Sequence, residues 1–258
     1  MSVILITFLG NFIVGGFIGI CGIAGFLLPM MYAGLLGFPV SQSLALSFLA
    51  FFVSGAIGSY NYHKRGNLDV RFSIIISVGS FFGGLLGVKL NALITPVQAK
   101  MLLYLVVLLS GISILCRKDK PANDSGAEKG KEKKGLLDSP VFVIAFGFIT
   151  GAVCSLSGAG GPVLVMPLLV ALGMPVHMSI GVALFDSVFI ALPACAGYMM
   201  QCDLSQMGLL LAVTVVAHGA GVVIGSSNAH KIKQKPLKLG VAVFSIAISI
   251  YMIANLLR

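Results

Sequence analysis

Apolar residues dominate this chain in long runs that short polar stretches separate. Ten runs lie at about 3–20, 26–36, 41–62, 70–90, 97–116, 139–156, 162–173, 176–200, 205–227 and 236–257. A helix needs about 20 residues to cross a hydrocarbon core of roughly 30 Å, and most of the runs approach that length. The runs at 26–36 and 162–173 are too short to cross. The pattern therefore predicts an all-α polytopic membrane protein with two short helical segments.

The pattern of runs occurs twice along the chain. Residues 15–48 align with residues 151–184 without a gap, at a shift of 136, and ten of the 34 pairs are identical. Both copies place glycines just before the short run. A duplicated apolar segment that glycines interrupt is typical of the substrate site of a secondary transporter. We predict transmembrane repeats at 1–116 and 139–258, with about five helical segments each, and a polar linker at 117–138.

Composition agrees with this membrane class. The chain is 58% hydrophobic and 10% charged, whereas a soluble domain carries about 25% charged residues. The runs are also longer than the roughly 10 residues that a barrel strand needs. Because the first run belongs to the repeat, we expect no cleavable signal peptide. The five cysteines have no paired spacing, so the sequence predicts no disulfide, metal or other cofactor.

The charged residues predict how the chain crosses the membrane. Cations gather at 63–71, in the linker 117–138 and at 231–238, whereas 201–204 holds an aspartate and no cation. Basic loops stay in the cytoplasm, which explains the net charge of +9 better than nucleic-acid binding does. All three basic stretches reach one side if 139–156 and 162–173 form a hairpin. The two repeats are then inverted, and their glycine breaks meet near the midplane.

The glycine breaks are the first candidate binding site. Gly22 and Gly25 precede the first short run, and Gly158, Gly160 and Gly161 precede the second. Non-helical backbone inside a membrane occurs only where protein buries it or where it lines a polar cavity. Two short helices that direct their N-terminal amides into the breaks would bind an anion without a cationic side chain. The alternative is that these glycines only allow close helix packing.

Three hydroxyls extend this candidate site. Ser155 and Ser157 flank the second break, and Ser47 lies in the run that follows the first short segment. A serine hydroxyl can donate a hydrogen bond to an oxyanion. It can equally donate to the carbonyl four residues earlier in its own helix, so both interpretations stay open.

Two titratable residues lie deep in the predicted spans. Asp186 is the only acidic residue within the apolar runs, and His218 lies in the middle of 205–227. A charged side chain at that depth costs a few kcal/mol or more, which makes Asp186 a functional candidate. A carboxylate and an imidazole together suit proton coupling. The alternative for His218 is a neutral histidine in the helix core.

The motifs at the breaks carry a family resemblance. They are Gly-Ile-Cys-Gly-Ile-Ala-Gly-Phe-Leu-Leu-Pro at 19–29 and Ser-Gly-Ala-Gly-Gly-Pro-Val-Leu-Val-Met-Pro at 157–167. Gly-Phe-Pro-Val at 37–40, Gly-Met-Pro-Val at 173–176 and the loop 64–69 add to them. With these motifs the chain resembles the TauE/SafE sulfite exporter family over essentially its whole length. It departs from the family pattern at Ile23 and Ala24, which replace glycines of the first break, and at Ala183, which replaces a hydroxyl.

The resemblance implies a multi-pass transporter in the plasma or inner membrane. Its substrates would be small sulfur-containing anions such as sulfite and organosulfonates, moved outward, with proton coupling and a homodimer as open additions. A passive anion channel of the same fold is the first alternative, and proton dependence that Asp186→Asn abolishes would separate the two. A membrane-embedded enzyme is less favoured, because the sequence has no nucleophile–base set or metal-ligand spacing.

The charge pattern yields a prediction about topology. We expect a cysteine introduced at position 203 to react with an impermeant reagent from outside the cell, in a protein that lacks its five native cysteines. A cysteine at position 129 in the linker should be protected until the membrane is permeabilised, because basic segments stay in the cytoplasm. Labelling of both positions from the same side would contradict the inverted arrangement.

Overall fold

The structure is a computed structural model that describes residues 2–22, 24–115, 137, 139–203, 207–229 and 234–257. The described part contains helices and no strand, which confirms the all-α prediction. Its long helices and the second short one are α1 (Ser2–Cys21), α3 (Val40–Lys64), α4 (Val70–Asn91), α5 (Pro96–Leu115), α6 (Pro140–Ser157), α7 (Gly161–Ala171), α8 (Val176–Met199), α9 (Gly208–Asn228) and α10 (Gln234–Leu256). The linker predicted at 117–138 lies outside the described residues, apart from residue 137.

The first short segment is a composite of three helix types. It begins with the 3₁₀ turn η1 (Ala24–Phe26), continues as α2 (Leu27–Met30) and ends as the π-helical turn η2 (Met31–Leu35). Among the described residues, α1, α3, α4, α6, α8 and α9 are long and apolar enough to cross a membrane. The chain is therefore a multi-pass membrane protein in which short helical segments lie among crossing helices.

Local sequence chemistry explains where two of the long helices begin. The side chain of Asp69 accepts a hydrogen bond from the backbone N–H of Phe72 at 3.0 Å, which caps α4. Ser139 accepts from the N–H of Phe142 at 3.5 Å and is followed by Pro140 in the first turn of α6. Both arrangements satisfy backbone donors that the start of a helix leaves free. A serine cap followed by a first-turn proline is a common helix start.

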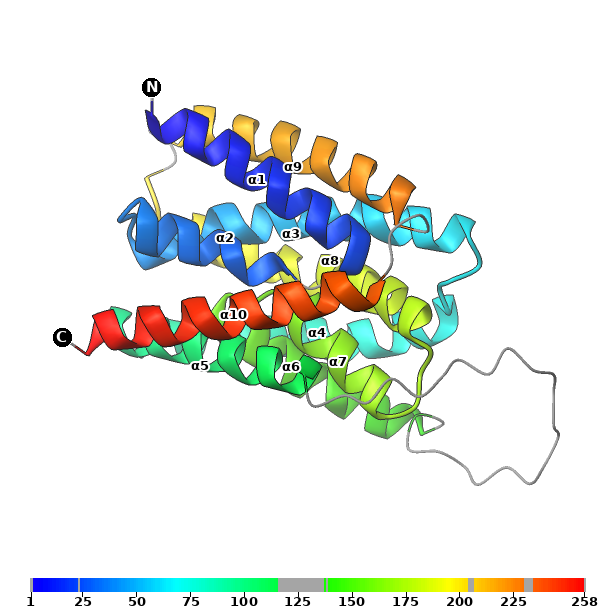
Figure 1. The fold of residues 1–258 in the computed structure, drawn as a ribbon. Coiled ribbons are helices and arrows are strands. Elements are labelled where there is room, and N and C mark those ends of the chain that lie inside the picture. Colours follow the sequence, from blue (N-terminus) through cyan, green and yellow to red (C-terminus); the bar gives the residue numbers. More distant parts are fainter. Residues whose placement is uncertain are drawn as a thin grey trace, which may run out of the picture.

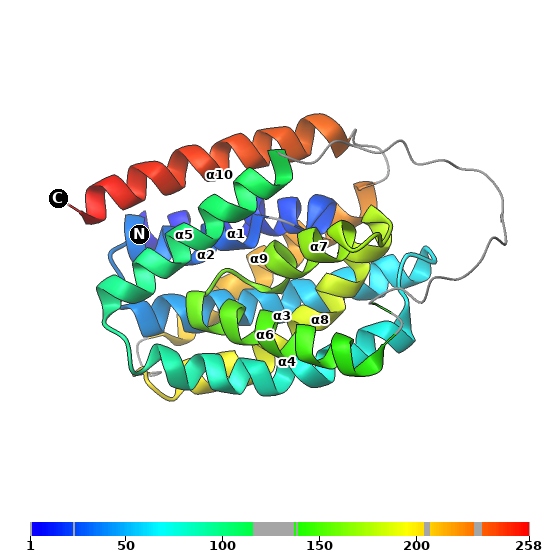
Figure 2. The same ribbon diagram turned by 90° about the horizontal axis from the view of Figure 1, so that it is seen from below.

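The two halves of the chain pack by pairing helices across the repeat. Helix α1 lies against α9 and α6 lies against α4, while α3 packs on α8 and α5 on α10 (Figures 1 and 2). Each of these pairs joins a helix of 1–116 to a helix of 139–258. The halves are therefore interlocked in one bundle.

Glycines allow the closest of these contacts. A methyl group on Gly83 of α4 would collide with the carbonyl oxygen of Phe148 in α6. A methyl group on Gly221 of α9 would likewise collide with the carbonyl oxygen of Phe12 in α1. Small residues at such contacts let helix backbones approach one another in a membrane, where apolar side chains gain little by associating. The dense small residues of α4 and α9 are thus explained by packing.

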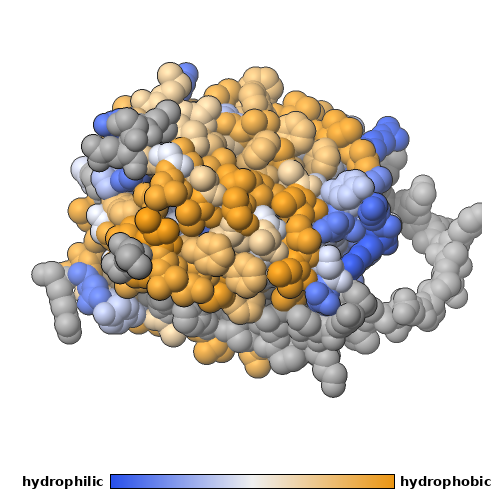
Figure 3. All heavy atoms as spheres, turned by 90° about the horizontal axis from the view of Figure 1, so that it is seen from above, coloured by the Kyte–Doolittle hydropathy of each residue, from blue (hydrophilic) through white to orange (hydrophobic). Residues whose placement is uncertain are grey.

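The ends of the bundle are polar and its side is apolar. Figures 1 and 2 place the α3–α4 connection at the same end as the start of α10, and the α4–α5 and α8–α9 connections at the opposite end. Between the polar ends, Figure 3 shows an apolar face over α1 and α9. Its exposed side chains include Leu5, Ile13, Val216 and Ile224, each more than half exposed. This face is suited to contact with lipid.

Candidate functional site

The two glycine breaks have the same backbone conformation at their first glycine. Gly22 has φ 72° and Gly158 has φ 76°, in the left-handed region where glycine has no steric penalty. The N–H of Gly22 donates to the carbonyl of Ile18, and the N–H of Gly158 donates to the carbonyl of Cys154, both at 2.8 Å. Each hydrogen bond closes the last turn of a helix, as a glycine after a helix end commonly does. The duplication seen in the sequence therefore extends to the backbone.

The two breaks differ after that glycine. In the second break, Gly160 has φ 81° and precedes the 11-residue helix α7, which begins at Gly161. In the first break, Ala24 stands at the position equivalent to Gly160 and begins the composite segment η1–α2–η2. Both short segments start at a break, as the sequence predicts. A continuous α-helix follows only the second.

The last turn of α6 fixes the loop of the second break. The Ser157 hydroxyl donates to the carbonyl of Val153 at 2.7 Å and accepts from the N–H of Ala159 at 3.3 Å. The thiol of Cys154 donates to the carbonyl of Gly160 at 3.3 Å. Ser157 thus makes the local bonds that the sequence left open as its alternative role, and it supports the loop.

The start of α7 keeps backbone donors available. In the described part of the chain, no hydrogen bond uses the N–H of Gly160 or of Gly161. The neighbouring Ala159 has no exposed surface, so these donors lie in the protein interior. Free N–H groups at a helix N-terminus, together with the positive end of the helix dipole, favour an anion.

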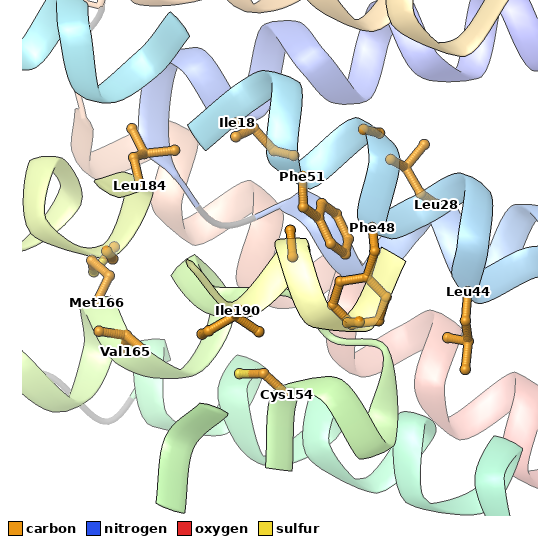
Figure 4. Close-up of a cluster of buried hydrophobic side chains, with 14 of the residues drawn as sticks. Ile18, Leu28, Leu44, Phe48, Phe51, Cys154, Val165, Met166, Leu184 and Ile190 are labelled. Atoms are coloured by element: carbon orange, nitrogen blue, oxygen red, sulfur yellow. The ribbon is translucent and has the colours of Figure 1, made fainter. Parts of the chain in front are cut away.

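A single aromatic ring lies beside both breaks. A methyl group on Gly25 would lie 2.9 Å from Cε1 of Phe51, and one on Gly160 would lie 3.0 Å from Cε2 of the same ring. Figure 4 shows Phe51 extending from α3 into the buried cluster. The second break also reaches the first short segment, because a methyl group on Gly158 would lie 3.8 Å from Cβ of Pro29. The structure therefore brings the two breaks together around Phe51, which sequence reasoning missed.

The other predicted hydroxyls differ in their bonding. Ser47 donates to the carbonyl of Ser43 in its own helix at 2.7 Å. Ser155 is fully buried, and its hydroxyl has no partner among the described residues. That hydroxyl is directed toward α4, since a methyl group on Gly84 would lie 3.3 Å from Oγ of Ser155. Of the predicted serines, Ser155 alone keeps an unused hydroxyl.

Asp186 lies in a polar cluster between α8, α4 and α6. It is fully buried, and its two carboxyl oxygens lie 3.2 Å and 3.0 Å from the hydroxyls of Ser77 and Ser80. The Ser80 hydroxyl also lies 3.1 Å from the carbonyl oxygen of Gly147. Ser77 and Ser80 are spaced by three on one helix, so they share a face. That spacing is the signal that sequence reasoning overlooked in this glycine-rich segment.

His218 belongs to a different helix pair. It is fully buried in α9, where it lies beside the backbone of Asn11 in α1. Nearby, Asn11 of α1 donates to the hydroxyl of Tyr32 at 2.7 Å, and that hydroxyl lies 3.0 Å from the hydroxyl of Thr214 in α9. No described hydrogen bond joins His218 to Asp186. The structure thus places the two candidate proton-coupling residues in separate clusters.

The described residues contain no group of three or more His, Cys, Asp or Glu side chains that could hold a metal ion. The candidate site therefore consists of backbone amides, hydroxyls and one carboxyl group.

Comparison with known proteins identifies the family. The family described as Sulfite exporter TauE/SafE matches residues 3–252. The chain belongs to this family. It is similar to the Probable membrane transporter protein YdhB of Bacillus subtilis, with 26% identity over 246 residues, 92% of this chain and 94% of that protein. A Probable membrane transporter protein of Haemophilus influenzae is 25% identical over 228 residues, 83% of this chain and 81% of that protein. No solved structure matches this TauE/SafE family member.

The Tyr32 cluster yields a prediction about stability. We expect Tyr32→Phe to lower the free energy of unfolding by about 1–3 kcal/mol, because buried Asn11 and Thr214 would each lose a partner. The measurement is thermal unfolding of the purified protein in detergent. Tyr60→Phe is the matched control, since the side chain of Tyr60 is 58% exposed. Equal unfolding temperatures for both variants would show that the cluster contributes nothing to stability.

Proposed function

We propose that this protein is a secondary-active transporter that exports small sulfur-containing anions such as sulfite and organosulfonates. The observation that carries the proposal is the set of buried, unbonded backbone N–H groups at the start of α7, on Gly160 and Gly161. These two donors can bind an anion without the help of a cationic side chain. The family description names sulfite, whose oxygens suit such donors.

We further propose that the two halves are inverted repeats. The reciprocal pairing of α1 with α9 and of α6 with α4 supports a two-fold relation, because each contact joins the first segment of one half to the fourth segment of the other. The direction of the helices supports the inversion, since α1 and α6 run in opposite directions in Figure 2. In Figure 2, α7 runs back beside α6 toward the end at which α6 begins. Alternating access would come from one set of helices rocking against the other around the breaks. A plasma or inner membrane location follows from this role.

Asp186 suits the role of a proton carrier in this mechanism. A hydroxyl has one hydrogen, so Ser80 can donate either to Asp186 or to the carbonyl of Gly147. When Ser80 donates to the carbonyl, its oxygen is free to accept from a protonated Asp186. The cluster therefore satisfies the carboxyl group in both protonation states, as a site that takes up and releases a proton requires.

Proton coupling distinguishes the transporter from a passive anion channel. We expect Asp186→Asn to abolish the acceleration of anion flux by a pH gradient in liposomes, while Asp203→Asn, an exposed control, leaves it unchanged. The asparagine can still bond Ser77 and Ser80, so the fold should persist. Gradient-driven flux that survives in the Asp186 variant would exclude this residue as the proton carrier.

The two breaks can be tested against each other at equivalent positions. We expect Gly160→Ala to reduce sulfite transport in liposomes by at least about tenfold, because a methyl group there is strained at φ 81° and lies 3.0 Å from the Phe51 ring. Ala24→Gly makes the reverse change in the first break and should be tolerated. Chromatography and thermal unfolding would verify that both variants are folded. Normal transport by the Gly160 variant, with loss of transport in a folded Gly22 variant, would assign substrate to the first break instead.

A further inference from the structure

We infer that the ring of Phe51 closes the anion site between the two glycine breaks and limits the size of the anions that enter it. This inference rests on the proposed function, because it concerns the space next to the amides of Gly160 and Gly161. It adds an apolar, specificity-determining side chain to a site of backbone amides and polar side chains.

The position of the ring carries the inference. Its two edges face different breaks: Cε1 lies 2.9 Å from a methyl group built on Gly25, and Cε2 lies 3.0 Å from one built on Gly160. The ring therefore fills the space that an anion bound by both breaks would occupy. Phe51 is 2% exposed, so the ring lies in the protein interior between the two breaks.

Neighbouring aromatic rings hold Phe51 in place. Phe48, one turn earlier on α3, meets it edge-on with ring centroids 5.5 Å apart, and Phe48 stacks on Tyr198 of α8 at 5.8 Å. Figure 4 shows Phe48 and Phe51 side by side in the buried cluster. Aromatic pairs in such geometries attract each other beyond the effect of burial. A ring held in this way can act as a defined closure of the site.

The repeat itself does not require a ring at this position. The residue equivalent to Phe51 in the second half is Ser187, at the same shift of 136. A methyl group on Gly161 would lie 3.0 Å from Cβ of Ser187, so this position also borders the start of α7. The same structural position therefore carries a small hydroxyl in one half and a large apolar ring in the other. We assign to Phe51 the role of the first half at this site, which is to limit the size of the anions that enter. The first break has Ala24 where the second has Gly160, so its backbone is less open to an anion.

A bound anion and the ring would compete for one volume. A small anion at the amides of α7 needs only a small displacement of the ring, whereas a bulkier organosulfonate needs a larger one. The apolar ring also keeps water from the buried amides when no substrate is present. A shorter side chain should therefore admit bulkier anions, with a smaller effect on small ones.

The test compares two anions and two neighbouring rings. Phe51→Leu, Phe51→Met and Phe52→Leu are reconstituted in liposomes, and initial rates are measured for sulfite and for the bulkier ethanesulfonate. We expect both Phe51 variants to raise the rate for ethanesulfonate relative to sulfite by about tenfold, a discrimination that small changes of pocket size produce. Phe52→Leu removes a ring of the same size from the next position of α3, which faces another direction, and should leave the ratio unchanged. Methionine is smaller than the ring but flexible, so it can fill part of the space and preserve the fold if leucine does not.

The possible outcomes distinguish failure of this inference from failure of the proposed anion export. An unchanged ratio in a folded Phe51 variant, or an equal change in the Phe52 variant, would show that the ring only packs the core and would overturn the inference. Absence of anion transport by the unsubstituted protein would instead contradict the proposed function, and this inference with it. An increase in the half-saturation concentration for both anions to the same extent would also count against a size limit.

Discussion

Backbone that leaves a helix inside a membrane must find hydrogen-bond partners or be enclosed by protein, and the architecture of this chain depends on that constraint. At both breaks the helix end is closed by a left-handed glycine, Gly22 or Gly158. The second loop is then fixed by bonds from Ser157 and Cys154. The N–H groups of Gly160 and Gly161 are left without a described partner, which makes this place suitable for a ligand.

Close helix pairing across the two halves provides the enclosure. Backbone contacts at Gly83 and Gly221 bring α4 against α6 and α9 against α1. These pairs form the walls around the breaks, and each wall takes one helix from each half. Any motion that opens the site must therefore move members of both halves together. This coupling suits a rocking transporter better than independent movement of two domains.

The repeated backbone carries different chemistry in its two halves. The second half supplies Gly160 and the buried carboxyl group of Asp186, where the first half has Ala24 and Ala50. The first half supplies the ring of Phe51, where the second has Ser187. Equivalent positions of the two halves therefore differ in chemistry: the second half carries polar groups, and the first half carries an apolar ring. In the proposed mechanism, the second half binds the anion, and the Phe51 ring of the first half limits which anions reach it.

The sequence alone determined the helical membrane class, the duplication and the places where each break begins. These features follow from apolar run length and from glycine spacing, which are local properties of the chain. The sequence could not show that Ser77 and Ser80 contact Asp186, that His218 lies in another cluster, or that Phe51 lies between the breaks. Those contacts join residues far apart in the chain, and helix pairing decides them. Only the tertiary structure fixes them, because many side chains of suitable size and polarity lie on every helix, and packing selects which ones meet.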